Sequence, residues 1–119
     1  MEIWLNPRCS KCRTATAFLD EAGVTYTLRR YLEDPPNADE IRAVLTRLGL
    51  EPWDITRTAE PAAKDLGLSA WGRTADDREQ WITALADNPS LIQRPIITAD
   101  DGHAVVARDD ETLHSLVTD

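Results

Sequence analysis

The chain has 119 residues and a formal net charge of −8, with 42% hydrophobic and 29% charged residues. This length accommodates one domain with a single modest hydrophobic core, and the composition is that of a globular protein rather than a disordered or fibrous one. The excess of acidic residues disfavours nucleic acid and anionic lipid as partners, because neutralising phosphate groups requires clustered Lys and Arg.

The sequence also lacks the patterns of membrane insertion and secretion. No apolar run approaches the roughly 20 residues of a membrane-spanning helix. Asn6, Pro7 and Arg8 interrupt the first segment before the apolar core of a signal peptide is complete. We therefore expect a cytoplasmic protein with no membrane partner, and we expect a monomer.

The first third of the chain predicts a β-α-β unit. Residues 2–6 form a short apolar run of strand length. From residue 10 to residue 22 apolar side chains recur at helical spacing, and Gly23 follows where a helix C-terminal cap is expected. Apolar and polar side chains then alternate over residues 24–28, which is typical of a second strand. The two strands of such a unit run parallel.

A helical insert is predicted over about residues 37–88. A pair of prolines breaks the chain just before it, and Asn37 with Glu40 resembles a capping box at the start of a helix that ends at Gly49. Beyond residue 50 the pattern stays mostly helical but is interrupted by Pro and Gly, with a clearer helix around Trp81.

The last third predicts a β-hairpin and a helix. Residues 95–98 and 103–107 are rich in β-favouring side chains and are joined by a short segment that ends in Gly102. A final helix is predicted to start at Asp109. The whole order predicts an α/β fold with a four-stranded mixed sheet and flanking helices.

Both cysteines of the chain lie in one Cys-Ser-Lys-Cys segment, at the junction of the first predicted strand and the first predicted helix. At a helix N-terminus, unpaired N–H groups and the positive end of the helix dipole favour the thiolate form of Cys9. Thiols in such places have pKa values of roughly 3.5–7.5, against about 8.5 for a free thiol. The flanking cations Arg8, Lys11 and Arg13 act in the same direction. We therefore predict that Cys9 is a nucleophile.

Cys12 follows Cys9 by three residues, a helical spacing that a disulfide spans. A Cys-x-x-Cys segment is also half of a zinc site, but the other candidate ligands, His103 and His114, are far away and lack metal-ligand spacing. A pair of inert, buried cysteines is disfavoured by the cationic turn around them. A phosphatase-like loop is disfavoured because Ala15 stands where its arginine belongs, six residues after Cys9. We expect no bound metal.

Several spaced segments resemble the glutaredoxin-coupled arsenate reductases, over nearly the whole chain. In order, they are Asn-Pro-x-Cys at residues 6–9, Tyr-Leu-Glu-x-Pro-Pro at 31–36, Arg57 with Glu60-Pro61 and Leu66-Gly67-Leu68, Asn88-Pro89, Gln93-Arg94-Pro95-Ile96-Ile97, and Arg108 with Glu111. The resemblance implies a thioredoxin-like fold in which Cys9 lies beside three arginines, here Arg57, Arg94 and Arg108. It also implies a cis peptide bond between Arg94 and Pro95.

The resemblance implies an arsenate reductase in which Cys9 attacks arsenate or a similar oxyanion. Guanidinium groups bind tetrahedral oxyanions through paired hydrogen bonds, which suits Arg57, Arg94 and Arg108 to binding and catalysis. Two further candidate substrate-binding residues, Ser10 and Arg13, follow Cys9 by one and four residues. No bound cofactor is expected, since an external thiol, from glutathione with glutaredoxin or from thioredoxin, would supply the electrons.

Two positions depart from the family pattern. Leu5 stands where many members carry a histidine, so any help from that histidine in ionising the thiol is missing. Cys12 stands where the glutathione-dependent prototype carries a serine, which leaves two routes open. Either Cys12 attacks Cys9 and closes a disulfide, or a small thiol attacks instead and forms a mixed disulfide.

Two other classes of protein share these sequence features. Transcription regulators of the Spx type have the same fold and cysteine pair, bind RNA polymerase and use the pair as a redox switch. Arg108 and the acidic segment from Asp109 to the C-terminus argue against this interpretation. A generic thiol-disulfide oxidoreductase that acts on another substrate is the second alternative.

Overall fold

A computed structural model describes residues 1–117, so the last two residues of the acidic C-terminal segment lie outside the described residues. The chain separates into two compact units. The first comprises Met1–Asp34 with Arg94–Asp119, and the second comprises Pro35–Gln93. The helical insert predicted over about residues 37–88 falls inside the second unit, and the prediction that the whole chain is one domain stays a prediction.

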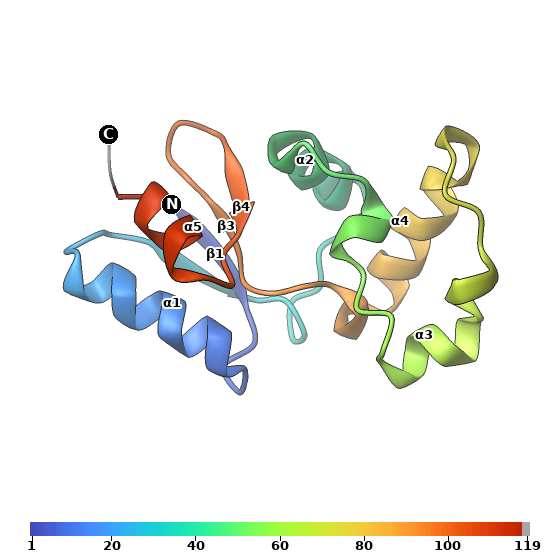
Figure 1. Cartoon of the computed structure of the whole chain (residues 1–119), viewed down its shortest axis with the longest axis horizontal. Helices are drawn as coiled ribbons and strands as arrows, with labels where there is room; N and C mark the ends of the chain where they lie inside the picture. Colours follow the sequence, from blue (N-terminus) through green and yellow to red (C-terminus); the bar gives the residue numbers. More distant parts are fainter. Residues whose placement is uncertain (118–119) are drawn as a thin grey trace. The chain divides into compact units, whose positions relative to one another are not determined.

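The first unit contains a four-stranded mixed sheet, as predicted. Its strands are β1 (Glu2–Leu5), β2 (Thr27–Arg30), β3 (Ile96–Thr98) and β4 (Ala104–Val106), arranged in the order β2-β1-β3-β4. β1 pairs in parallel with β2, while the β1–β3 and β3–β4 pairs are antiparallel. The parallel β-α-β start and the C-terminal hairpin are therefore both confirmed (Figure 1).

The second strand starts later than its alternating pattern suggested. Gly23 adopts a positive φ of 72°, and the N–H group of Val24 donates to the Leu19 carbonyl at 3.0 Å, so the chain is still closing the preceding helix here. Pairing with β1 begins only where the Thr27 N–H donates to the Met1 carbonyl at 2.9 Å. Leu28 remains 53% exposed, because β2 lies at the edge of the sheet.

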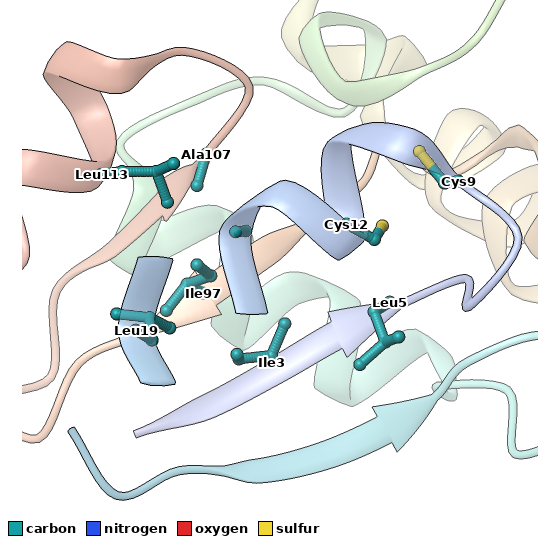
Figure 2. Close-up of a cluster of buried hydrophobic side chains, with 9 residues drawn as sticks. Ile3, Leu5, Cys9, Cys12, Leu19, Ile97, Ala107 and Leu113 are labelled. Carbon is teal, nitrogen blue, oxygen red and sulfur yellow. The ribbon is translucent and has the colours of Figure 1, made fainter. Parts of the chain in front are cut away.

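Helices α1 (Ser10–Glu21) and α5 (Asp110–Ser115) pack on one face of this sheet. Apolar residues of the strands and helices form a common buried cluster, which Figure 2 shows in close-up: Ile3, Leu5, Cys9, Cys12, Ala15, Leu19, Ile97, Ala107 and Leu113. The rings of Phe18 on α1 and His114 on α5 also meet, with centroids 4.9 Å apart. Both cysteines thus begin the helix that covers the core.

The second unit consists of helices joined by short turns. Its α-helices are α2 (Ala38–Leu48), α3 (Pro61–Leu66) and α4 (Arg78–Asp87), with short 3-10 helices η1 (Pro52–Ile55), η2 (Leu68–Ala70), η3 (Ala75–Asp77) and η4 (Pro89–Leu91) between and after them. Trp81 of α4 is fully buried at its centre, where Trp53 and Trp71 meet it edge-on. Its indole N–H donates to the Gly72 carbonyl at 2.8 Å.

The predicted capping box of α2 is present. The Asn37 side chain accepts a hydrogen bond from the Glu40 N–H at 2.8 Å, and the Glu40 carboxylate accepts one from the Asn37 N–H at 3.1 Å. Gly49 ends the helix with a φ of 67°, a conformation that glycine adopts without steric strain. The local sequence therefore specifies both ends of this helix.

Among residues 1–117, the helices are all too short or too polar to meet the requirements of a membrane span.

Candidate active site

Cys9 occupies the N-cap position of α1, directly after the turn that follows β1. Its backbone is extended, with φ −83° and ψ 126°, and its carbonyl accepts the N–H of Arg13 at 3.1 Å. The Cys9 N–H donates to the Asn6 carbonyl at 2.9 Å, which fixes the turn. No acidic residue lies in the first turn of α1, so the positive end of the helix dipole is not offset there.

The pKa of the Cys9 thiol is lowered from 9.0 to about 7. Burial alone would raise this pKa, because Cys9 is only 8% exposed. The backbone N–H and thiol of Cys12, the Arg94 guanidinium and the Lys11 N–H together outweigh burial by stabilising the thiolate. The thiolate form of Cys9 is therefore accessible near neutral pH.

Cys12 is fully buried one turn further along α1 (Figure 2). The pKa of its thiol is raised to about 11, mainly by burial and in part by the negative charge of Cys9, while the Asn6 N–H, which donates to the Cys12 sulfur at 3.5 Å, acts in the opposite direction. At neutral pH the cysteine pair therefore carries its negative charge on Cys9, with Cys12 as the hydrogen-bond donor.

Two of the three predicted arginines lie in the same unit as Cys9. The Arg94–Pro95 peptide bond is cis, as predicted, and the Arg94 side chain interacts with the Cys9 sulfur. Arg108, just after β4, donates from Nη1 to the Arg94 carbonyl at 2.7 Å. The β3–β4 pairing thus places Arg108 against the backbone of the residue whose side chain meets Cys9.

The third predicted arginine, Arg57, belongs to the second unit. Its Nη1 donates to the Ser90 carbonyl at 3.1 Å, and its Nη2 lies 2.5 Å from a carboxylate oxygen of Glu60. Its backbone N–H donates to the Leu91 carbonyl at 2.7 Å, which ties this segment to η4. The convergence of all three arginines on Cys9 stays a prediction.

Ser10 and Arg13, the two further candidates, differ in position. Ser10 is the exposed first residue of α1. Arg13 lines a groove of about 210 Å³ between α1 and the β2 edge, together with Leu5, Pro7, Cys12, Thr16, Asp20, Tyr26, Leu28 and Arg30. Arg13 thus lies on the Cys12 side of α1, and a role for either residue in substrate binding stays a prediction.

Sequence reasoning assigned no role to two residues that contact the predicted site residues. Asn6 donates its N–H to Cys12, and Glu60 pairs with Arg57. Both belong to segments that carried the family resemblance. Among residues 1–117, no three His, Cys, Asp or Glu side chains gather closely enough to hold a metal ion.

The chain is similar to known proteins over nearly its whole length. The chain is 64% identical over 118 residues to the "Uncharacterized protein in glnII region" of Streptomyces viridochromogenes, covering 99% of each chain. It is 34% identical to the arsenate reductase of Neisseria meningitidis serogroup B, covering 98% of this chain and 97% of that one.

Solved structures of similar proteins show which fold the chain shares with them. The arsenate reductase from Vibrio cholerae superposes with a TM-score of 0.86 at 33% identity, covering 98% of each chain. This likeness confirms the predicted thioredoxin-like α/β fold. The model of the ArsC family matches residues 4–116. With its sheet, its N-cap cysteine and its cis Arg94–Pro95 bond in place, the chain belongs to the ArsC family.

Proposed function

We propose that the protein is a thiol-dependent arsenate reductase, which converts arsenate to arsenite through a bond between the Cys9 sulfur and arsenic. The observation that carries this proposal is the Cys9 thiol at the start of α1, with a pKa of about 7 and Arg94 beside it. The arsenate reductases of Neisseria meningitidis and Vibrio cholerae, at 34% and 33% identity, support the same substrate class.

Arsenate is a tetrahedral oxyanion, so its binding requires fixed positive charges and hydrogen-bond donors. The Arg94 and Arg108 guanidinium groups supply both within the first unit. Arg57 is assigned to the same anion on the family resemblance, and Ser10 and Arg13 are retained as further binding residues on the same ground. Because these groups also stabilise the charge that shifts during the reaction, they lower the barrier as well as binding the substrate.

In the first chemical step, the Cys9 thiolate attacks arsenic, and one arsenate oxygen takes up protons and leaves as water. Arsenic keeps its oxidation state in this exchange of an oxygen for a sulfur ligand. In the second step, a thiolate attacks the Cys9 sulfur and the electron pair of the S–As bond passes to arsenic. Arsenic is thereby reduced from As(V) to As(III), the two sulfurs are oxidised to a disulfide, and arsenite leaves.

The coupling between the two cysteines suits Cys12 to the second step. While Cys9 is a thiolate, its charge helps to keep Cys12 protonated. Once Cys9 is bonded to arsenic that charge is gone, so the pKa of Cys12 falls and burial remains the main cause that raises it. The Cys9–Cys12 disulfide is then reduced by an external dithiol protein such as glutaredoxin or thioredoxin.

A thiol-disulfide oxidoreductase acting on another substrate is the second candidate. The unequal pKa values of Cys9 and Cys12 favour it, because one thiol that attacks and one that stays protonated also suit disulfide exchange. Reduction of a small disulfide in the absence of arsenate distinguishes this activity from the proposed one.

The proposal is tested by arsenate-dependent NADPH oxidation, coupled either to glutathione with glutaredoxin or to thioredoxin, and by the Cys9→Ser variant. Loss of a nucleophile should lower kcat by about 1,000-fold or more, since the hydroxyl is a far weaker nucleophile at neutral pH. Circular dichroism of the variant controls for its fold. A Cys9→Ser enzyme that keeps more than a tenth of the wild-type rate would falsify the proposal.

A further inference from the structure

A groove of about 440 Å³ lies in the second unit, along one face of α4. Its volume falls within the roughly 300–1,000 Å³ of pockets that take small organic ligands. Leu66 and Trp71 form its apolar wall, while Thr83 and Ala84 of α4 leave room for a ligand because their side chains are small. The lining residues all belong to the second unit, so neither cysteine takes part in this groove.

The apolar wall of the groove is partly exposed and is held in place. Leu66 is 39% exposed, and the large ring of Trp71 is also only partly buried. The Trp71 ring meets the Trp81 ring edge-on, with centroids 5.5 Å apart. The Trp81 indole N–H donates to the carbonyl of Gly72, the residue after Trp71. These contacts fix the wall before a ligand binds, which reduces the entropic cost of binding.

The charged side chains of the groove are acidic. Of the residues that the structure describes, the groove is lined by the carboxylates of Glu79 and Asp87 and by no basic side chain. Arg42 already balances Glu79, with its Nη2 2.7 Å from a carboxylate oxygen. Within residues 1–117, the Asp87 carboxylate has neither an ion pair nor a hydrogen bond. The negative charge that a ligand would meet in the groove is therefore that of Asp87.

The position of Asp87 on α4 gives a second reason for a cation to bind there. Asp87 is the last residue of α4, where the helix dipole has its negative end, and the last turn carries no basic residue. A carboxylate at this end of a helix is unfavourable unless a positive charge offsets it. An ammonium group beside Asp87 is attracted by the carboxylate and by the helix end together. The face of the Trp71 ring attracts cations as well.

We propose that this groove binds a small organic cation, a primary ammonium carried on an aromatic body. The ammonium pairs with Asp87, and the aromatic ring packs against Leu66 and Trp71. An anion of the same shape is rejected, because it would meet Asp87 and the end of α4 with like charge. This site goes beyond the proposed function, since neither arsenate nor a thiol takes part in it, and its tests do not depend on arsenate turnover.

The first test compares two ligands of similar shape and opposite charge. 2-Phenylethylamine, which is protonated at neutral pH, and 3-phenylpropionate are each titrated into the whole protein and followed by NMR. The amine should cause saturable shifts of the Trp71 indole N–H and of the Thr83 and Asp87 amides, with a Kd of about 1 mM. The carboxylate should bind at least about tenfold more weakly. Equal affinity for the two ligands, or no shift of these signals up to about 10 mM amine, overturns the proposal.

Two variants at helix ends provide a matched comparison. Asp87→Asn removes the carboxylate that lines the groove, whereas Asp65→Asn removes an exposed carboxylate in the last turn of α3 that does not line it. Both changes remove a negative charge near the negative end of a helix, and thermal unfolding of both variants controls for the fold. Asp87→Asn should weaken amine binding about fivefold, while Asp65→Asn leaves it within about twofold. Equal weakening by the two variants overturns the proposal.

A tethered competitor tests the same site without removing Asp87. Thr83 is exposed, lines the groove and precedes Asp87 by four residues, a spacing at which helical side chains meet. In Thr83→Lys the new ammonium should occupy Asp87 and weaken amine binding at least about tenfold, whereas the uncharged Thr83→Gln should weaken it no more than about threefold. Equal amine affinity in the lysine and glutamine variants contradicts an ammonium site at Asp87 and overturns the proposal.

Discussion

The predicted site arginines of the two units have different partners. In the first unit, Arg94 meets the Cys9 sulfur and Arg108 holds the Arg94 backbone. In the second unit, Arg57 contacts the Glu60 carboxylate and the Ser90 carbonyl. The groups that favour the Cys9 thiolate therefore belong to the same unit as Cys9. In the second unit, the charge of Arg57 is already balanced by the Glu60 carboxylate. Substitutions in the first unit should therefore change thiol activation, whereas a substitution of Arg57 in the second unit should not.

The largest expected effect that tests this difference is that of Arg94→Ala. Alkylation of Cys9 by iodoacetamide, followed by mass spectrometry, should have a midpoint near pH 7 in the wild type, because only the thiolate reacts and it predominates above its pKa. Losing the adjacent cation should raise that midpoint by about 1 pH unit. It should also slow arsenate turnover roughly 100- to 1,000-fold, the effect of removing an oxyanion donor.

Arg57→Ala is the control from the second unit. It should slow arsenate turnover but leave the pH midpoint of alkylation near 7. A shift of the midpoint as large as that of Arg94→Ala would contradict the division of roles between the units.

Variants of Cys12 sharpen the comparison within the first unit. Cys12→Ser keeps a hydroxyl that can donate to the Cys9 thiolate, whereas Cys12→Ala removes the donor. The alanine variant should therefore have the higher Cys9 pKa, with roughly a three- to tenfold smaller thiolate fraction at pH 6. Alkylation rates measured side by side check this, and identical pH profiles for the two variants would remove Cys12 as a source of thiolate stabilisation.

The smallest expected effect is that of Glu60→Gln. The amide can still accept a hydrogen bond from Arg57, but the charge that offsets this guanidinium is lost. The KM for arsenate should fall about two- to fivefold, in line with the modest energies of partly exposed ion pairs, and the alkylation profile should not change. A KM that rises instead would show that Glu60 is needed to hold Arg57 in place.

Much of the fold follows from local sequence patterns. The capping box and Gly49 specify α2, and the junction of an apolar run with a helical pattern places Cys9 at the start of α1. The start of β2 was not predictable in this way, because the alternating pattern continues through residues whose N–H groups close the preceding helix. Period-two alternation reports side-chain character and not backbone hydrogen bonding.

The candidate site was less accessible from the sequence than the fold. Helix-end chemistry alone favours a reactive Cys9, but the neighbours Arg94 and Arg108 came from the family resemblance, since each arginine by itself looks like a surface charge. The split of pKa values between Cys9 and Cys12 depends on burial, and burial is a property of the packed core.

The complete burial of Cys12 bears on how the protein tolerates peroxide. An oxidant in solution meets the Cys9 sulfur first, because Cys12 offers no accessible surface. A sulfenic acid at Cys9 would form within reach of a protected thiol, whose attack yields a reducible disulfide before further oxygen atoms can add. The burial that keeps Cys12 protonated therefore also protects the thiol whose attack on an oxidised Cys9 prevents its irreversible oxidation.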